Sequence, residues 1–260
     1  MYTPYSKIET LYERNTERRE DGLKPGALLP ELKLKNPLYG AIKEWVWTEK
    51  IDGTNMRVEW NPTGEADGGT PIYGDFGGVT PPGTLIIGGK TDKANINGAL
   101  MSRMQSLFTA EKLREVFSAQ VVTFYGEGYG AGIQKIGTLY KPEKDFIGFD
   151  IFIHTDGIFG GFWLSDEDMR QVYARLGIDV VPYVMTASLE EAAGYVANGF
   201  KSVIGNAVAE GLVGRTVLPL FDGRGNRLIT KIKTVDFDPN VKYNTRPWLR
   251  NHIVYSPGVL

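Results

Sequence analysis

The chain has 260 residues, of which 42% are hydrophobic, and a formal net charge of −2. This composition argues against an intrinsically disordered chain and against a protein that coats nucleic acid through bulk basicity. The sequence contains no cysteine and only two histidines, His154 and His252. A thiolate metal site is therefore excluded, and a histidine-rich zinc site or a serine–histidine triad is disfavoured. Chemistry based on lysine, carboxylates and a hard cation remains.

The first residues lack the basic and apolar regions of a signal peptide. No segment approaches the roughly 20 apolar residues that cross a bilayer. Together with the absence of cysteine, this pattern favours a reducing, cytoplasmic setting. We expect a monomer that does not associate with membranes.

The first strand-like runs, 44–51 and 56–60, flank Asp52-Gly53. An Asp-Gly pair between β-prone runs predicts a tight hairpin. A loop rich in glycine and proline at 61–83 leads to a short predicted strand at 84–90. The segment 99–118 has apolar residues three and four positions apart, which predicts one or two helices.

Two buried strands are predicted over 120–130 and 145–155, and Asp156-Gly157 marks a turn after the second strand. A helix is expected to begin at Ser165, with acidic residues in its first turn, and to end at Gly177. The segment from Ser188 to Gly199 repeats this pattern.

The last clear unit, 209–234, contains two β-rich runs around the sequence DGRGN, which predicts an antiparallel hairpin. Lys231 and Lys233 are two residues apart, so on a strand both side chains project from one face. Taken together, the elements predict an α+β fold in which antiparallel sheets are flanked by a few helices.

Five short segments carry candidate chemistry. Lys-x-Asp-Gly alone would occur by chance about once in twenty chains of this length, so the order of the segments matters more than any one of them. They are EKIDGTN at 49–55, FYGEGYGAGIQK at 124–135, DFIGFDIF at 145–152, AEGLVGR at 209–215 and TKIKT at 230–234.

This order and spacing resemble the covalent nucleotidyltransferases, which include ATP-dependent RNA and DNA ligases and mRNA capping enzymes. Asn55 and the GIQK sequence at 132–135 are similar to the RNA ligases, most closely to the RNA ligase 2 group. DNA ligases and capping enzymes usually have arginine where this chain has Asn55. The resemblance implies a nucleotidyltransferase (adenylyltransferase) domain and the activity of an RNA ligase.

The resemblance also implies a reaction in three steps. Lys50 would attack the α-phosphorus of ATP and form lysyl-AMP, AMP would move to an RNA 5′-phosphate, and a 3′-hydroxyl would then be sealed to that activated end. A free lysine has a pKa near 10.4, and the amine must be neutral to attack. We expect burial and nearby cations to lower the pKa of Lys50.

The same resemblance implies a role for other residues. Glu127 would accept a ribose hydroxyl and Phe149 would stack on adenine. Asp52 and Glu210 would hold Mg²⁺ or Mn²⁺, which suits oxygen ligands. Charge on the α-phosphate would be neutralised by the two lysines of the last segment, Lys231 and Lys233.

Three further residues complete the expected nucleotide site. Asn55 would lie near the triphosphate and assist sealing. Glu49 would point away from the reactive amine. Lys90 stands where the family usually has arginine, and lysine keeps the charge but loses the bidentate grip on phosphate; Lys93 is a possible substitute. Gln134 is a further candidate contributor, together with Lys135.

Only 26 residues follow Thr234, fewer than the barrel of DNA ligases or the helical domain of RNA ligase 2 relatives would need. We therefore expect a nucleotidyltransferase domain over 1–238 and a short extension over 239–260 that packs on it through Trp248. The grip on a nicked RNA duplex would then come from arginines of the catalytic domain, namely Arg14, Arg18, Arg19, Arg224 and Arg227.

Two alternatives compete with the RNA ligase interpretation. A minimal ATP-dependent DNA ligase is disfavoured by Asn55 and by the lack of room for a barrel. A catalytically inactive module that binds a nucleotide or RNA would have no need to keep Lys50 with its carboxylate and lysine partners. The sequence leaves nicked duplexes, cleaved tRNA loops and single strands open as substrates.

Overall fold

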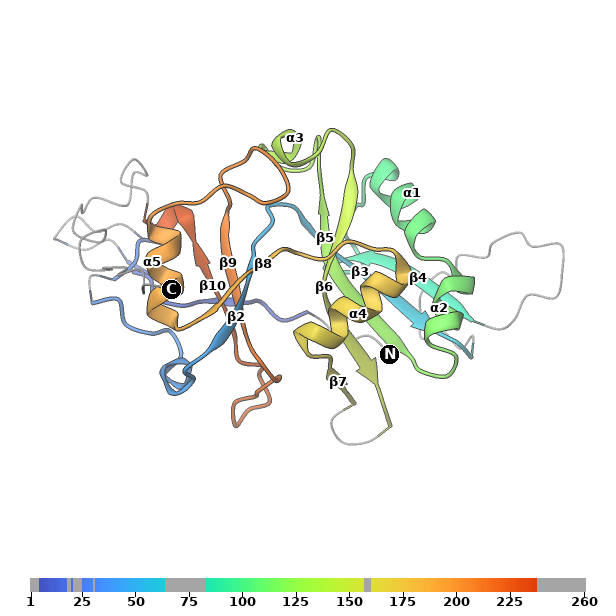
Figure 1. The fold of residues 1–260 in the computed structure, drawn as a ribbon, viewed down its shortest axis with the longest axis horizontal. Helices are drawn as coiled ribbons and strands as arrows, with labels where there is room; N and C mark the ends of the chain where they lie inside the picture. The colour runs from blue at the N-terminus through green and yellow to red at the C-terminus, as the bar shows by residue number, and fades with distance from the viewer. Residues whose placement is uncertain are drawn as a thin grey trace, which may run out of the picture. The chain divides into compact units, whose positions relative to one another are not determined.

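The structure is a computed structural model that describes residues 5–17, 20, 25–29, 31–63, 83–156 and 160–237. The chain forms two compact units (Figure 1). Unit 1 comprises Met1–Ser6 and Asp52–Val181, and unit 2 comprises Lys7–Ile51 and Pro182–Leu260. The proposed extension over 239–260, with Trp248, lies outside the described residues, so the predicted division into domain and extension stays a prediction.

Unit 1 contains a five-stranded sheet in the order β4-β3-β5-β6-β7, in which every neighbouring pair is antiparallel. Its strands are β3 (Thr54–Asn61), β4 (Thr84–Gly89), β5 (Val122–Tyr129), β6 (Asp145–His154) and β7 (Gly161–Trp163). The predicted strands at 84–90, 120–130 and 145–155 are thereby confirmed. Gly157, which was predicted to form a turn, lies outside the described residues.

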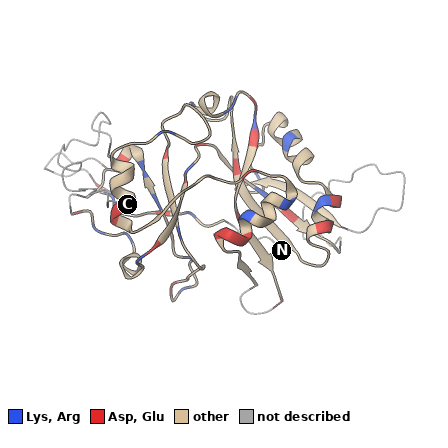
Figure 2. Cartoon of the chain, viewed as in Figure 1, with Lys and Arg blue, Asp and Glu red and all other residues tan. Residues whose placement is uncertain are grey.

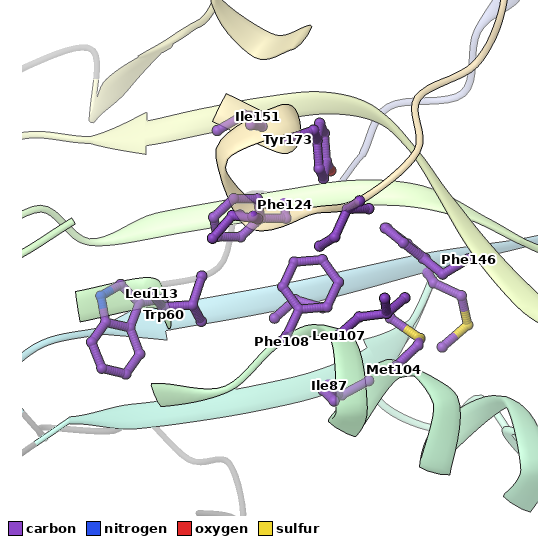
Figure 3. Close-up of a cluster of buried hydrophobic side chains, with 14 of the residues drawn as sticks. Trp60, Ile87, Met104, Leu107, Phe108, Leu113, Phe124, Phe146, Ile151 and Tyr173 are labelled. Carbon is purple, nitrogen blue, oxygen red and sulfur yellow. The ribbon is translucent and has the colours of Figure 1, made fainter. Parts of the chain in front are cut away.

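The helices of unit 1 are α1 (Gly98–Leu107), α2 (Ala110–Val116), the short α3 (Gly137–Tyr140) and α4 (Asp166–Leu176). Residues from α1, α2 and α4 pack with β3, β5 and β6 into one hydrophobic core, part of which is drawn in Figure 3. The predicted helical segment 99–118 forms two helices because Phe108 and Thr109 adopt extended backbone, and the Thr109 hydroxyl caps the second helix at the Lys112 amide.

Unit 2 contains a second five-stranded sheet in the order β1-β10-β9-β2-β8. Its neighbouring strands are antiparallel except for the parallel pair β1–β10. The strands are β1 (Glu9–Thr10), β2 (Trp45–Glu49), β8 (Tyr183–Ala187), β9 (Gly211–Thr216) and β10 (Ile229–Lys233), and two short 3-10 helices are η1 (Pro37–Ala41) and η2 (Thr234–Asp236).

Helix α5 (Leu189–Ala197) covers one face of this second sheet. Its buried residues pack with Trp45, Trp47, Leu212 and Ile232 in the core of unit 2. The Ser188 side chain and Glu191 form a reciprocal capping box at the start of α5. The predicted helix start at Ser188 is therefore confirmed.

Two more sequence predictions are confirmed by local geometry. The Ser165 side chain caps α4, and α4 ends at Gly177 in the left-handed conformation with φ 69°. Strands β9 and β10 are antiparallel, and the Asp222 amide bonds to the Asn226 carbonyl in the loop between them. With helices and mainly antiparallel sheets in both units, the predicted α+β class is also confirmed.

The hairpin predicted at Asp52-Gly53 is wrong. Strand β2 pairs with β8 and β9, whereas β3 pairs with β4 and β5. Asp52 and Gly53 therefore lie where the chain leaves one sheet and enters another. A Cβ at Gly53 would collide with the Gly128 carbonyl and lie 2.7 Å from the Glu127 Cγ. Glycine is needed at this position because two backbones approach each other closely. The Asp-Gly pair is also typical of a tight turn, which is why the sequence predicted a hairpin here.

Within the described part of the chain, no helix combines the length and the apolar character that crossing a bilayer requires.

Candidate active site

The candidate residues fall into two sets, one in each unit. In unit 2 the strand register decides which side chains share a face. Lys231 of β10 lies opposite Val213 of β9, and Val213 lies opposite Thr48 of β2. Because side chains alternate along a strand, Lys50, Lys231 and Lys233 fall on the face opposite α5. The prediction that Lys231 and Lys233 project from one face is confirmed by this register.

Glu210 connects two of these lysines. The Lys50 Nζ donates to Glu210 Oε2 at 2.5 Å, and the Lys233 Nζ donates to Glu210 Oε1 at 2.7 Å. The three side chains are only 17–32% exposed. Backbone bonds hold the strand ends that carry them, because the Lys50 amide donates to the Gly211 carbonyl and the Thr234 amide donates to the Glu210 carbonyl. One carboxylate thus bridges two ammonium groups.

Lys231 lies on the same face as this bridge, and its surroundings disfavour its charged form. Burial, followed by the charges of Lys233 and Lys50, lowers the pKa of Lys231 to about 8, against a smaller opposing effect of Glu210. A half-buried ammonium group next to two others is an unfavourable arrangement by itself. An anion such as a phosphate would relieve it, so this face of unit 2 is suited to anion binding.

Glu49 lies on the other face of β2, the face of Trp45 and Trp47, and is almost fully buried. It therefore points away from the amine of Lys50, as expected. Its Oε2 accepts the Val203 amide at 2.9 Å, whereas Oε1 has no hydrogen-bond partner in the part of the chain that the structure describes. Burial raises the pKa of Glu49, although Ser202 and the Val203 amide lower it. The buried Oε1 is suited to accept a hydrogen bond from a bound ligand.

In unit 1 the candidate residues lie on the sheet face opposite the helices. Met56 and Val58 point into the helix-covered core, so Asn55 of the same strand points to the opposite face. Asn55 is directly opposite Glu127 in the β3–β5 register. Two polar side chains predicted to contact the nucleotide are therefore neighbours on one surface.

Phe149 reaches this face through a β-bulge. Asp150 pairs with Tyr125 and Gly148 pairs with Gly126, so Phe149 is the extra residue between them on β6. A bulge turns a side chain out of the regular alternation. The Phe149 ring contacts the Tyr5 ring edge-on at 5.1 Å, and the Tyr5 hydroxyl donates to Asp150 at 2.8 Å. Phe149 remains 9% exposed, and its predicted stacking on adenine stays a prediction.

The segment that follows Lys50 is held by other residues of unit 1. The Asp52 amide donates to the Tyr140 hydroxyl at 3.3 Å, and the Gln134 side-chain amide donates to the Gly53 carbonyl at 2.9 Å. Gln134 adopts a left-handed backbone with φ 53°, which is uncommon outside glycine. The GIQK segment therefore helps to hold the backbone that follows Lys50, through the hydrogen bond from Gln134.

Charge by itself does not mark the site, because Figure 2 shows residues of both signs along the ribbon of each unit. Arg14, which was proposed to grip a duplex, pairs with buried Asp236 at 2.6 Å and donates to the Gly26 carbonyl. Arg18 and Arg19 lie outside the described residues. Arg224 is exposed in the β9–β10 loop.

A family model described as RNA ligase matches residues 43–233, which is more than half of the chain. The chain belongs to the RNA ligase family. This match includes the first four of the five segments on which the resemblance was based and all but the last residue of the fifth, so the prediction of the family is confirmed. No curated protein sequence matches the chain significantly.

Solved structures of Naegleria gruberi RNA ligase have a similar fold. A mutant with ATP and Mn has a TM-score of 0.53 and 18% identity, over 76% of this chain and 51% of that chain. Another mutant with ATP and Mn has a TM-score of 0.53 and 17% identity, over 88% and 59%. A mutant with AMP and Mn has a TM-score of 0.52 and 17% identity, over 76% and 52%. This RNA ligase family member thus spans about half to three-fifths of those chains.

The donor groups of this family member constrain how it would hold a metal ion. Among the described residues there is no group of three or more histidine or acidic residues that could hold a metal ion. Mg²⁺ usually keeps several waters and binds one or two carboxylates together with substrate phosphates. Glu210 fits that mode. The predicted metal pair of Asp52 and Glu210 belongs to different units and stays a prediction.

Sequence reasoning missed two residues beside the expected sites, Tyr140 and Arg57. The alternation of β3 could have revealed Arg57, because it is two residues after Asn55 and must share its face. No feature of the neighbouring sequence indicates a role for Tyr140. Its hydroxyl meets the Asp52 amide only because the fold brings α3 close to that residue. Lys90, the last residue of the strand predicted over 84–90, lies just beyond β4 in an exposed loop, and its predicted contact with phosphate stays a prediction.

Proposed function

We propose that this protein is an ATP-dependent RNA ligase that forms lysyl-AMP on Lys50, transfers AMP to an RNA 5′-phosphate and seals that end to a 3′-hydroxyl. The observation that carries this proposal is the bridge of Glu210 between Lys50 and Lys233, with Lys231 on the same face. Family membership and the similarity to RNA ligase structures with ATP, AMP and Mn support it.

In the first step the neutral amine of Lys50 attacks the α-phosphorus of ATP. A bond forms between Nζ and phosphorus, the bond from phosphorus to the bridging oxygen breaks, and pyrophosphate leaves with that electron pair. The amine must give up a proton before or during the attack. Glu210 would hold or receive this proton, which its hydrogen bond from Lys50 supports.

The positive charge of the lysine cluster suits this step, in which negative charge develops on phosphate oxygens. Lys231 and Lys233 would neutralise the negative charge that develops on the phosphate oxygens and on the departing pyrophosphate. Binding the polyphosphate would also relieve the mutual repulsion of the three lysines. When bound at Glu210, Mg²⁺ or Mn²⁺ would supply further neutralisation of phosphate charge. It would at the same time compete with the ammonium groups for the carboxylate.

The next two steps return Lys50 to its starting state. An oxygen of the RNA 5′-phosphate attacks the phosphorus of lysyl-AMP, the nitrogen–phosphorus bond breaks, and the amine regains a proton. The 3′-hydroxyl then attacks the 5′-phosphate, loses its proton and releases AMP. Asn55 would assist this sealing step, and Lys90 would contact the polynucleotide phosphate, as the family resemblance implies.

Other residues would select the nucleotide. Glu127 would accept a ribose hydroxyl, and Phe149, turned outward by its bulge, would stack on adenine. The buried Oε1 of Glu49 would accept a donor of the nucleotide, since it has no hydrogen-bond partner in the part of the chain described. Satisfying a buried acceptor only in the complex favours the correct ligand.

The first experiment tests lysyl-AMP formation. The wild-type protein is incubated with α-labelled ATP and Mg²⁺ or Mn²⁺, and the labelled residue is located by mass spectrometry of peptides. Lys50 should carry AMP, Lys50→Ala should not be labelled, and pyrophosphate should reverse the labelling. A wild type without covalent AMP would instead favour an inactive binding module, and equal labelling of Lys50→Ala would exclude Lys50 as the nucleophile.

The second experiment tests the RNA assignment. Matched nicked duplexes carry either RNA or DNA on the 3′-hydroxyl side, and sealing by the adenylylated protein is followed in single turnover. We expect faster sealing with RNA on that side. Equal rates, or a preference for DNA, would favour the DNA ligase interpretation.

A further inference from the structure

An almost completely buried arginine holds the loop that carries Lys90. Arg57 of β3 lies between Gly88 of β4 and Tyr125 of β5 in the sheet register, and its side chain is only 5% exposed. A Cβ at Gly88 would lie 2.7 Å from the Arg57 Nη1. The glycine therefore leaves room for the guanidinium to lie across β4, the strand beside β3 in Figure 1.

Each nitrogen of the guanidinium has a defined partner. Nε donates to Glu59 at 2.8 Å, Nη1 donates to the Gly89 carbonyl, and Nη2 donates to Asp92. Glu59 already balances the charge of Arg57. The second carboxylate, Asp92, has a side chain that is 77% exposed and so has no need of a partner for its own solvation. The bond to Asp92 acts mainly on the position of the loop.

The loop from Gly89 to Ala94 has an exposed but defined course. Its residues 90–94 are exposed, yet the Ala94 amide donates to the Thr91 carbonyl at 3.0 Å. A Cβ at Gly89 would lie 2.5 Å from that of Ala94, so the two ends of the loop are in close approach. Together with the bonds from Arg57, these contacts fix the loop at both ends and at Asp92.

The charges of this loop indicate what the bond between Arg57 and Asp92 does. Lys90 and Lys93 flank Asp92, the one acidic residue of the KTDK sequence. The bond to Arg57 fixes the position of this carboxylate, and with it the course of the chain that carries the two lysines. Lysine also lacks the bidentate fork of arginine, so its grip on a phosphate depends more on how its backbone is held.

We propose that Arg57 and Asp92 are positioning residues that hold the 89–94 loop ready to contact a phosphate of the RNA through Lys90 and Lys93. This inference rests on the proposed function for the identity of the polynucleotide. Arg57 acts through the Gly89 carbonyl and Asp92, without contacting RNA itself. A preformed loop binds more tightly because less ordering is needed at the moment of binding.

The test is direct binding of a labelled nicked RNA duplex, measured by fluorescence anisotropy without ATP. Simple electrostatics predicts that Asp92→Ala, which removes a negative charge, binds RNA more tightly. The positioning role predicts the opposite, a weakening of about fivefold or more. Asp92→Asn should weaken binding less, because its side-chain carbonyl still accepts from Arg57. Asp166→Asn serves as the control, since Asp166 also pairs with an arginine of unit 1, Arg170, and should bind like wild type.

A double-mutant cycle separates positioning from an independent contact. If Asp92 acts through the lysines, adding Asp92→Ala to the pair Lys90→Ala and Lys93→Ala should change RNA affinity by less than about twofold. Full additivity would overturn the inference, as would unchanged or tighter binding by Asp92→Ala alone. Arg57→Lys, which keeps the charge but loses the fork, should behave like Asp92→Ala.

The rate of lysyl-AMP formation provides the second readout. It should fall no more in Asp92→Ala than in the Asp166→Asn control, and a parallel loss of both properties would show general damage and overturn the proposed role. If the wild type forms no lysyl-AMP, the proposed function fails, whereas the binding measurements still test the loop.

Discussion

The two units hold their candidate residues by different physical means. In unit 2 the candidate side chains are charged and hold one another, since Glu210 bridges Lys50 and Lys233 beside Lys231. In unit 1 the placement comes from the backbone, through the bulge at Phe149 and the close approach of Gly53 to Gly128. Unit 2 should therefore be sensitive to changes of charge, and unit 1 to changes of shape.

The largest expected effect is from Glu210→Ala, which tests the charge side of this comparison. Removing the carboxylate leaves the ammonium groups of Lys50 and Lys233 without their common partner and removes the candidate metal ligand. We expect lysyl-AMP formation to fall by about 10²-fold or more, as for other groups that act on transition-state charge, with some loss of thermal stability because the ammonium groups lose their carboxylate partner. Rapid labelling with ATP and thermal unfolding measure the two properties.

Glu13→Ala is the control for that variant, because Glu13 forms an ion pair with Lys33 in the same unit at 3.4 Å. It should match wild type in both measurements. If Glu210→Ala labelled as fast as this control, the cluster would not be part of the reaction.

The next effect tests the shape side. In Gly53→Ala the new methyl group would meet the Gly128 carbonyl and the Glu127 side chain, so we expect a loss of about 1–3 kcal/mol in the free energy of unfolding. The shift of Asp52 and its neighbours should also slow lysyl-AMP formation. Gly98→Ala has open space around its Cβ and should retain wild-type stability. Equal stability of the two variants in denaturant titrations would contradict the close approach.

The substitution Phe149→Ala tests whether the residue at the β6 bulge contacts the nucleotide. If Phe149 stacks on adenine, its removal should weaken ATP binding by about 1–3 kcal/mol, measured by calorimetry. Phe162→Ala provides a comparison on the neighbouring strand, where the side chain is exposed, and should leave ATP binding unchanged. A Phe149→Ala protein that binds ATP normally would assign Phe149 to packing with Tyr5.

The smallest effect is a change of pH dependence in unit 2. The lowered pKa of Lys231, about 8, means that this side chain is charged below pH 8 and loses its charge as the pH rises through 8. The second-order rate constant of lysyl-AMP formation reports the free protein and should therefore decline above about pH 8. Lys231→Arg keeps its charge at all these pH values and should lose the decline, whereas Lys233→Arg should retain it.

The ends of the helices were predictable because they depend on a few adjacent residues. Ser165, Ser188 and Gly177 occupy the cap positions that their sequence patterns indicate. The charged face of β10 was predictable for the same reason, since Lys231 and Lys233 need only the alternation of one strand. The resemblance, through Lys50 and the four later segments, also led to the correct family.

The failures concern residues whose roles depend on distant partners. The Asp-Gly pair after Lys50 indicated a hairpin, but β2 and β3 find better partners elsewhere in the chain. The bulge at Phe149 was not predicted, because it depends on the pairing of β6 with β5. Arg57 was overlooked because its partners Gly89 and Asp92 are more than 30 residues away.

The sequence by itself determined the helix caps, the family and which side chains are candidates for the reaction, because each depends on side-chain chemistry or on contacts within a few residues. The tertiary structure decided which strands pair, which face each lysine and carboxylate occupies, and that Glu210 reaches both Lys50 and Lys233. These outcomes depend on the packing of Trp45, Trp47 and α5 on one sheet and of α1, α2 and α4 on the other. Burial of those apolar faces leaves the opposite faces for the polar and charged residues.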